Sequence, residues 1–265
     1  MTSSHSSNSD SWSSAFTAEA DTEAISLRGR VVLITGGSRG LGAAIAQVVG
    51  ERGARVVLAD LDLQRAQDRA ALLAERDIQA LPLPLDVGDP AQCQNVVEQV
   101  QHHFGRLDAL VNNAAVDVTA PLAQLEVADW LRVLSTNLSG PLVMSKYAAA
   151  LMAQQSDGGQ IVNIASTASR RAWPNASAYH ATKWGLLGLS HALHAELRDQ
   201  GIRVCAVIAG GMRTPFLLDR FPDIDATRLQ DPLHVARAVR YVLEQPPATC
   251  IPELMVLPQR ESSWP

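Results

Sequence analysis

A tyrosine and a lysine, Tyr179 and Lys183, stand four residues apart at the start of a segment with helical spacing. This interval puts the phenol and the ammonium on one helical face, one turn apart. A free tyrosine has a pKa near ~10, and a neighbouring cation lowers the pKa of the phenol because it favours the phenolate. A phenol tuned in this way is a competent general acid and base. The same spacing also occurs in surface pairs that have no function.

Ser166 supplies a hydroxyl that can act together with this pair. It follows an apolar run at 161–165 and precedes Tyr179 by 13 residues (179 − 166). If the run is a buried strand, Ser166 and Tyr179 both lie at the carboxyl edge of the sheet, where a hydroxyl can hydrogen-bond the substrate oxygen. Thr167 or Ser169 can take the same place in principle.

Asn137 is a further polar candidate. It lies within a helical pattern at 127–154, at a position where an apolar residue would pack better and where asparagine is a poor helix former. A polar break there can hold a water beside Lys183. A kink in the helix or a capping role explains the asparagine equally well.

A glycine-rich turn runs from Thr35 to Gly42, between the first apolar run and a helical segment. Glycines let backbone N–H groups approach a pyrophosphate closely, and a helix N-terminus supplies partial positive charge. The spacing of the three glycines differs from the commoner G-x-G-x-x-G, but its place after a strand and before a helix indicates a dinucleotide site. The candidate cofactor residues in this turn are Gly36, Ser38, Arg39, Gly40, Leu41 and Gly42.

Asp60 ends the second apolar run and, with Leu61, is a candidate contact for the adenosine half of a cofactor. A carboxylate there accepts hydrogen bonds from the ribose hydroxyls and repels a 2'-phosphate, which favours NAD over NADP. Arg39 in the glycine turn favours NADP instead, because a cation can pair with a 2'-phosphate. Asp60 or Asp62 can also serve simply as the cap of the following helix.

Two further strand ends carry candidate cofactor contacts. Asp86 and Val87 close the third apolar run, and the carboxylate can bind the adenine amino group or merely start a turn. Asn113 and Ala114 close the fourth run, at the edge where open α/β sheets bind ligands. Small residues at that edge let the backbone and a ligand come close.

The elements that must position these residues are short apolar runs alternating with longer segments of helical spacing. The predicted strands are 30–35, 55–59, 80–85, 107–111, 160–165, 202–208 and 254–257, and the predicted helices lie near 41–52, 62–76, 90–104, 127–154, 177–199 and 232–245. Continuous apolar strands separated by helices predict a doubly wound α/β fold, with parallel strands covered on both faces. We expect one domain over 26–265 and a disordered Ser-rich tail over 1–25.

Composition excludes several classes of function. The chain has 265 residues, a net charge of −5 and no basic run, so it lacks the electrostatic footprint of a nucleic-acid or anionic-membrane binder. No segment approaches the ~20 apolar residues of a membrane span, and the N-terminus lacks the apolar core of a signal peptide, so we expect a cytoplasmic protein. Three cysteines at wide spacing predict neither a disulfide framework nor a metal site.

Taken jointly and in order, these motifs resemble the compact short-chain dehydrogenase/reductase family over about residues 28–258. The resemblance rests on the glycine turn, on the Asn-Asn-Ala strand end at 112–114 and on four residues that match the family's catalytic tetrad, Asn137, Ser166, Tyr179 and Lys183. It implies a Rossmann-type fold with a seven-stranded sheet. It also implies hydride transfer between a nicotinamide cofactor, NAD or NADP, and an alcohol or ketone.

The resemblance assigns a role to each member of the tetrad. Tyr179 is implied as the general acid and base, and Ser166 polarises the substrate oxygen. Lys183 binds the nicotinamide ribose and lowers the pKa of the phenol, while Asn137 anchors a relay water. The alternative is a non-catalytic NAD(P)-binding regulatory protein on the same fold, although such a protein has no need for a phenol beside an ammonium.

The sequence departs from the family pattern at three places, two on the cofactor side and one on the substrate side. Ala115 and Ala209 stand where the family usually has glycine and proline, and the common Asp-Gly-Gly of the last strand is missing. Met212 and Thr214 still match the positions that meet the carboxamide and pyrophosphate. The resemblance also implies a homodimer or homotetramer, through helices such as the one at 183–197.

Substrate choice is expected in two stretches, 215–221 and 170–173. An apolar lid at 215–221, with Phe221, suits a small hydrophobic alcohol or ketone. Arg171 or Arg213 can instead pair with a substrate carboxylate. The sequence does not decide between these two classes of substrate.

Overall fold

Seven parallel strands form the centre of the molecule in the computed structural model, which describes residues 25–261. The strands are β1 (Val31–Thr35), β2 (Arg55–Asp60), β3 (Ala80–Pro84), β4 (Ala109–Asn112), β5 (Gly159–Ser166), β6 (Ile202–Ala209) and β7 (Glu253–Val256). Their order is β3-β2-β1-β4-β5-β6-β7, and every neighbouring pair is parallel. This order confirms the predicted doubly wound, Rossmann-type sheet. The order reverses between β1 and β4, which is where such sheets bind ligands.

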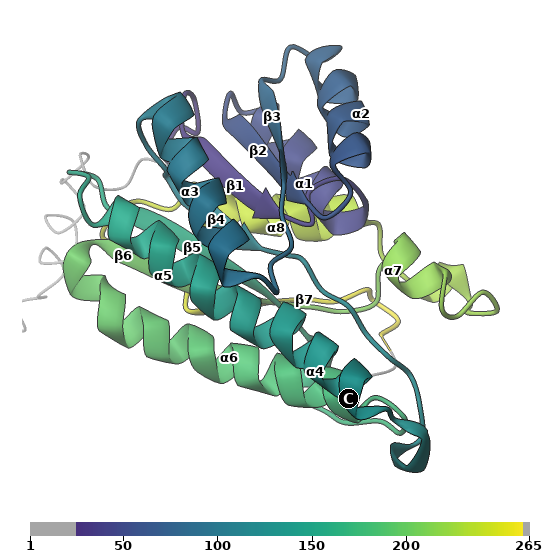
Figure 1. Cartoon of the computed structure of the whole chain (residues 1–265). Helices are drawn as coiled ribbons and strands as arrows, with labels where there is room; N and C mark the ends of the chain where they lie inside the picture. The colour runs from purple at the N-terminus through teal and green to yellow at the C-terminus, as the bar shows by residue number, and fades with distance from the viewer. Residues whose placement is uncertain (1–24, 262–265) are drawn as a thin grey trace, which may run out of the picture.

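Helices cover both faces of the sheet (Figure 1). They are α1 (Gly40–Gly50), α2 (Leu63–Ala74), α3 (Pro90–Phe104), α4 (Val127–Leu134), α5 (Gly140–Met152), α6 (Ser177–Leu197), α7 (Pro215–Leu218) and α8 (Pro232–Leu243). Buried side chains of α3, α5 and α6 pack on one face, and those of α1, α2 and α8 pack on the other. The short α7 lies apart from both layers, beyond the carboxyl end of β6 (Figure 1).

The first strand shows how the sequence produces two cores. Val32 and Ile34 belong to the buried cluster under α1 and α8, whereas Val31 and Leu33 belong to the cluster under α3 and α5. Successive side chains of a strand point to opposite faces of the sheet. Because helices cover both faces, the strand is a continuous apolar run rather than an alternating one.

The helix predicted over 127–154 is interrupted. Between α4 and α5 the chain makes a π-helical turn over Ser135–Ser139, and Asn137 is buried inside that turn. A π-turn inserts an extra residue into the helix and is common at functional sites. The polar residue that fits poorly in a helix therefore marks the place where the α-helical hydrogen bonding is broken.

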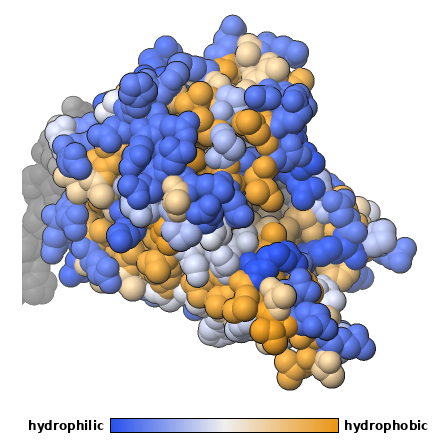
Figure 2. All heavy atoms as spheres, in the orientation of Figure 1, coloured by the Kyte–Doolittle hydropathy of each residue, from blue (hydrophilic) through white to orange (hydrophobic). Residues whose placement is uncertain are grey.

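On the face that Figure 2 shows, hydrophilic residues predominate, and a group of hydrophobic residues lies at the end of the molecule that carries α4. Leu122, Val127 and Leu131 are all more than half exposed at this end. Among residues 25–261, no helix is both long enough and apolar enough to cross a membrane. The tail predicted over 1–25 lies, apart from its last residue, outside the described part of the chain.

Candidate active site

A cavity of about 1160 Å³ opens at the carboxyl edge of the sheet, where the ends of the central strands converge. Most of the residues proposed from sequence line it, namely Gly36, Arg39, Gly40, Leu41, Asp60, Leu61, Asp86, Val87, Asn113, Ala114, Ser166, Tyr179, Lys183, Met212 and Thr214. Three do not, and lie behind the lining: Ser38, Gly42 and Asn137. The fold therefore brings residues from seven separate stretches of the chain to one place.

Ser166 and Tyr179 meet at one end of this cavity. Ser166 is the last residue of β5, and its hydroxyl accepts a hydrogen bond from the Ala168 N–H at 3.1 Å. Tyr179 lies in the first turn of α6, which begins at Ser177. The strand end and the helix start thus present a hydroxyl and a phenol to the same space, as the sequence predicts.

Lys183 lies one turn after Tyr179 and is 3% exposed. Its Nζ donates a hydrogen bond to the Ile164 carbonyl at 2.7 Å and lies 5.6 Å from the centre of the Tyr179 ring. Burial lowers the pKa of Lys183 to about 8, and the charge of Asp117 acts in the opposite direction. A buried ammonium group, fixed by a backbone hydrogen bond, therefore lies next to the phenol.

The pKa of Tyr179 moves opposite to the sequence-based expectation. Burial raises it to about 12, and hydrogen bonding with Ser166 offsets part of this rise. Asp117 raises the pKa further, whereas Arg220 lowers it. The spacing of Tyr179 and Lys183 indicates only that a cation is near, and it does not reveal how much water the fold removes from the phenol.

Asn137 connects the π-turn to the stretch that follows β4. Its Oδ1 accepts a hydrogen bond from the Val116 N–H at 2.8 Å, and its Nδ2 donates to the Val116 carbonyl at 2.8 Å. Nδ2 also lies 3.3 Å from the Thr182 hydroxyl, on α6 beside Lys183. Of the three readings that the sequence leaves open, a side-chain cap does not apply, and the broken helix is present. The relay water stays a prediction.

The glycine turn is shaped by contacts that exclude a side chain. Gly36 has a φ of +63°, and a Cβ there would lie 3.0 Å from the Ala114 Cα. A Cβ on Gly42 would lie 2.1 Å from the Gly36 carbonyl oxygen and 2.7 Å from the Asn113 Nδ2. Only glycine permits this packing of turn against helix, which brings the backbone of the turn to the cavity.

Asn113 links the glycine turn to β4. Its Nδ2 donates to the carbonyls of Thr35 at 2.9 Å and Gly36 at 3.0 Å. The Thr35 hydroxyl in turn accepts hydrogen bonds from the N–H groups of Asn113 and Ala114, both at 3.0 Å. These bonds fix the two strand ends at the switch point, so Asn113 shapes the turn as well as lining the cavity.

Asp60 holds the neighbouring backbone. Its carboxylate accepts hydrogen bonds from the N–H of Ser38 at 3.0 Å and of Asp62 at 3.1 Å. The cap of α2 is Asp62, which accepts from the Arg65 N–H, so Asp60 is not the helix cap. Arg39 lies 3.6 Å from the Asp219 carboxylate, just after α7.

The residues present fit a dinucleotide. The cavity runs without a break from Asp60 and Asp86, at the β2 and β3 ends, to Tyr179 and Lys183. Its middle is lined by the glycine turn, where a Cβ has no room and the helix N-terminus of α1 begins. A long cleft with a polar end, a backbone cradle and a phenol at the far end suits a pyrophosphate-linked cofactor.

A sequence model of the family described as short chain dehydrogenase matches residues 30–225. The chain belongs to this family. The match covers every strand of the sheet except β7, together with the cavity residues from the glycine turn to α7. The compact short-chain dehydrogenase family that the motifs resemble is therefore confirmed.

This short chain dehydrogenase is similar to proteins of different specificity. It is 38% identical to galactitol 2-dehydrogenase of Agrobacterium fabrum, over 69% of this chain and 71% of that one. It is 35% identical to cis-4-hydroxycyclohexanecarboxylate dehydrogenase of Sinomonas cyclohexanicum, over 80% and 88% of the two chains. A metagenomic short-chain oxidoreductase solved in complex with NADP superposes with a TM-score of 0.78, at 31% identity over 89% and 99% of the two chains.

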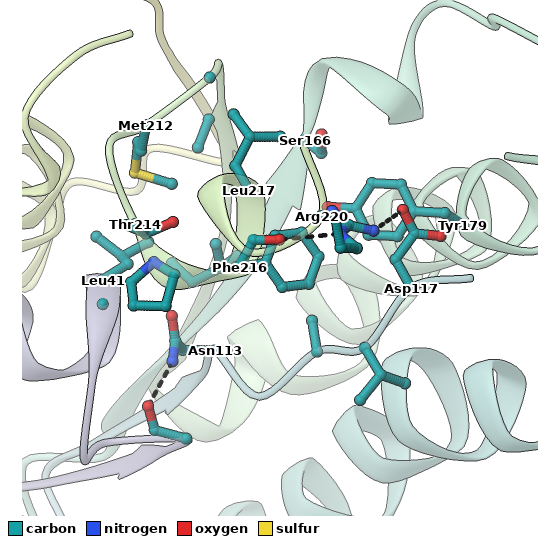
Figure 3. A pocket seen from close by; sticks show the side chains of 18 of the residues that line it. Leu41, Asn113, Asp117, Ser166, Tyr179, Met212, Thr214, Phe216, Leu217 and Arg220 are labelled. Carbon is teal, nitrogen blue, oxygen red and sulfur yellow. Dashed lines mark hydrogen bonds and ion pairs between the residues drawn. The ribbon is translucent and has the colours of Figure 1, made fainter. Parts of the chain in front are cut away.

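Sequence reasoning misplaces the charged groups at the substrate end of the dehydrogenase. Arg171 and Arg213 do not line the cavity, and Arg213 instead donates to the Leu229 carbonyl at 2.5 Å. Asp117 and Arg220 line it in their place (Figure 3). A charged residue in the apolar stretch after Asn113 is a signal that could have identified Asp117.

Glu261 near the C-terminus is a second residue that sequence reasoning missed. Its Oε2 accepts a hydrogen bond from the Gly211 N–H at 2.8 Å, and it lines the cavity. Three residues after Gly211, Thr214 lies beside the glycine turn, since a Cβ added at Gly40 would be 3.5 Å from the Thr214 Cβ. The turn after β6 is thus held between the C-terminal stretch and the glycine turn, with Met212 and Thr214 facing the cavity (Figure 3).

Proposed function

We propose that the protein is an NAD(P)-dependent oxidoreductase that interconverts an alcohol and a ketone, with Tyr179 as the general acid and base. The observation that carries the proposal is the meeting of the Tyr179 phenol and Ser166 at one end of a cofactor-sized cavity, with Lys183 buried behind the phenol. A purely regulatory dinucleotide-binding protein gains nothing from burying a lysine at this place, because burying an unpaired charge costs stability.

The chemistry divides between the cofactor and the chain. Bound NAD(P) supplies the acceptor for the hydride that leaves the carbinol carbon, and the donor for the reverse reaction. Tyr179 Oη accepts the hydroxyl proton in the oxidation and returns it to the carbonyl oxygen in the reduction. Ser166 hydrogen-bonds that oxygen in both directions.

Lys183 makes the proton transfer easier. The phenol has a pKa raised to about 12, so forming the phenolate at neutral pH is costly. The Arg220 guanidinium lowers this cost. In the proposal the Lys183 ammonium adds to that effect, and it is anchored on the Ile164 carbonyl rather than free to leave. Because Lys183 lines the cavity beside Tyr179, it would also hold the nicotinamide ribose of a bound cofactor.

Asn137 is a positioning residue in the proposal. By pairing with both polar groups of Val116 it fixes the stretch after β4 against α6. That stretch lines the same cavity as Tyr179, so its position sets the space left for the substrate.

We also propose that NAD is preferred over NADP. Asp60 lines the cavity at the end of β2, where its negative charge opposes a 2'-phosphate. Arg39, the cation that would favour NADP, is 3.6 Å from Asp219 and so is partly neutralised. NADP is the alternative cofactor, because the metagenomic relative was solved in complex with NADP. Asp60→Asn should lower the ratio of kcat/KM for NAD over NADP at least tenfold, and an unchanged ratio would refute the role of Asp60.

The proposed activity is tested by a substrate panel. The purified protein is assayed with NAD and NADP against secondary alcohols, polyols and hydroxy acids, and with the reduced cofactors against the matching ketones. Formation or loss of reduced nicotinamide is followed by absorbance. Turnover of at least one alcohol and ketone pair is expected. Tight cofactor binding without turnover on the whole panel would favour the regulatory alternative.

We also propose that the protein forms a homodimer or a homotetramer. Val127 and Leu131 on α4 and Trp184 on α6 are each more than half exposed, and a second copy of the chain can bury them. Light scattering on the full chain should give two or four times the mass of 28.4 kDa. Leu131→Glu should lower that mass, and a wild-type protein that is monomeric at all concentrations would contradict the proposal.

A further inference from the structure

A buried carboxylate stands at the substrate end of the cavity with one oxygen unpaired. Asp117 follows the end of β4, lines the cavity, and has a side chain that is 7% exposed. Its Oδ2 is paired with an Arg220 Nη1, whereas its Oδ1 is buried and has no hydrogen-bond partner within the described chain. An unpaired buried carboxylate oxygen is costly, so a donor from a bound molecule would be favourable there.

Arg220 is held in place from three sides. Its Nε donates to the Phe216 carbonyl at 2.9 Å, and its guanidinium lies 4.3 Å from the centre of the Phe216 ring and 5.4 Å from that of Phe221. Stacking on aromatic faces and a carboxylate partner fix the plane of an arginine well. The pair is therefore a rigid part of the cavity wall rather than a loose surface ion pair.

The Asp117–Arg220 pair lies beside the reacting groups. The Phe216 ring, which supports Arg220, is 5.9 Å from the ring of Tyr179, and Figure 3 shows Asp117 and Arg220 next to Tyr179. The charges of both residues also act on the pKa of Tyr179, in opposite directions. A substrate whose oxygen reaches Tyr179 must place its neighbouring atoms near this pair.

The Asp117–Arg220 pair discriminates among three kinds of substrate group next to the reacting carbon. An apolar group leaves Oδ1 buried without a donor. A carboxylate brings a second negative charge to Asp117 and competes for an arginine that is already neutralised. A hydroxyl group donates to Oδ1 and can accept from the guanidinium, so it satisfies both partners.

We propose that Asp117 and Arg220 form a subsite for a second hydroxyl group close to the reacting carbon, so that the enzyme prefers neutral diols and polyols, and the corresponding hydroxyketones. This inference rests on the proposed oxidoreductase function. It places the substrate nearer to that of the galactitol relative than to that of the hydroxycyclohexanecarboxylate relative.

The test compares substrates with matched carbon skeletons. Values of kcat/KM are measured for butane-2,3-diol, butan-2-ol and 3-hydroxybutanoate, and for cyclohexane-1,2-diol and cyclohexanol, with the preferred cofactor. The wild-type enzyme should use each diol at least tenfold better than its mono-alcohol, because a hydrogen bond to a charged group is typically worth about that factor or more. It should use 3-hydroxybutanoate less well than the diol.

Asp117→Asn is the decisive variant, since it keeps the shape of the side chain and removes its charge. The ratio of diol to mono-alcohol should fall about tenfold, while the ratio of 3-hydroxybutanoate to mono-alcohol should rise because Arg220 is freed. Ratios within one variant cancel any change in the pKa of Tyr179, which affects all substrates alike. Asp129→Asn, at an exposed ion pair on α4, is the matched control and should leave both ratios unchanged.

The outcomes separate the subsite from the activity. Equal use of diols and mono-alcohols by the wild type, or an equal loss on both in Asp117→Asn, overturns the subsite and leaves the oxidoreductase intact. A wild-type preference for 3-hydroxybutanoate also overturns it and assigns Arg220 to a carboxylate. If no substrate of either panel is turned over, the proposed function itself fails. If the variant does not fold, equal wild-type use of diols and mono-alcohols still overturns the subsite.

Discussion

The side-chain amide of Asn137 pairs with both backbone groups of a single residue, Val116, at 2.8 Å each. β4 has ended before Val116, so no neighbouring strand pairs with its backbone. The amide of Asn137 instead satisfies both its N–H and its carbonyl. The π-turn that breaks the long helix is what turns this amide toward the cavity wall. The same two hydrogen bonds therefore stabilise the stretch after β4 and set the position of the cavity wall.

Asn137→Ala should destabilise the protein by about 1–3 kcal/mol, because the N–H and the carbonyl of the half-buried Val116 both lose their partner and each hydrogen bond contributes ~0.5–1.5 kcal/mol. The measurement is the free energy of unfolding in urea. Ser139→Ala, an exposed position of the same π-turn, is the matched control and should change stability by less than about 0.5 kcal/mol. Equal effects of the two changes would show that the pairing with Val116 is not important.

Gly42→Ala should weaken cofactor binding at least tenfold. The added Cβ would lie 2.1 Å from the Gly36 carbonyl oxygen, so the glycine turn must move away from α1. Overpacking of this kind also costs about 1–3 kcal/mol of stability. The dissociation constant of the reduced cofactor is measured by fluorescence. Gly188→Ala is the control and should bind normally, because apart from its chain neighbours and the adjoining backbone of α6 no described atom lies within 4 Å of the added Cβ. Normal binding by Gly42→Ala would contradict the close packing.

The burial of Lys183 should appear in the pH dependence of stability. Its pKa falls from 10.5 to about 8 on folding, so between these values the unfolded chain binds more protons than the folded one. Stability relative to Lys183→Met should therefore rise as the pH increases from about 8 to 10.5, and stay flat below about 8. The rise corresponds to about 3 kcal/mol.

The comparison uses unfolding free energies of the wild type and Lys183→Met across that pH range. Because Tyr179 is present in both proteins, its own titration cancels to first order. Lys146→Met, at an exposed lysine on α5, should show no such difference from the wild type. A flat difference for Lys183→Met, as for Lys146→Met, would mean that the ammonium remains well solvated.

The order of strands and helices was predictable because both faces of the sheet are covered. Runs such as 31–34 and 56–59 are apolar throughout, and the segments between the strands have helical spacing, so the sequence carries the pattern directly. The glycine turn was predictable for a similar reason, since Gly36 and Gly42 stand where any side chain would clash.

The substrate end was not predictable, because its groups come from segments without periodic pattern. Asp117 and Arg220 are 103 residues apart in the chain, and nothing in either local sequence indicates the other. The raised pKa of Tyr179 was missed for the same physical reason, since burial of the phenol depends on segments that only the fold brings around it. Arg171 and Arg213 looked equally suitable by charge alone.

The central claim is that the Tyr179 phenol moves the proton, and Tyr179→Phe tests it most directly. The variant keeps the ring against Phe216 and removes only the hydroxyl, so cofactor affinity should change less than threefold while kcat falls by about 10²–10⁴. Tyr241→Phe, 54% exposed on α8, is the control and should keep wild-type turnover. If Tyr179→Phe binds cofactor normally and retains turnover near that of the control, the phenol is not the acid and base, and the mechanism is wrong.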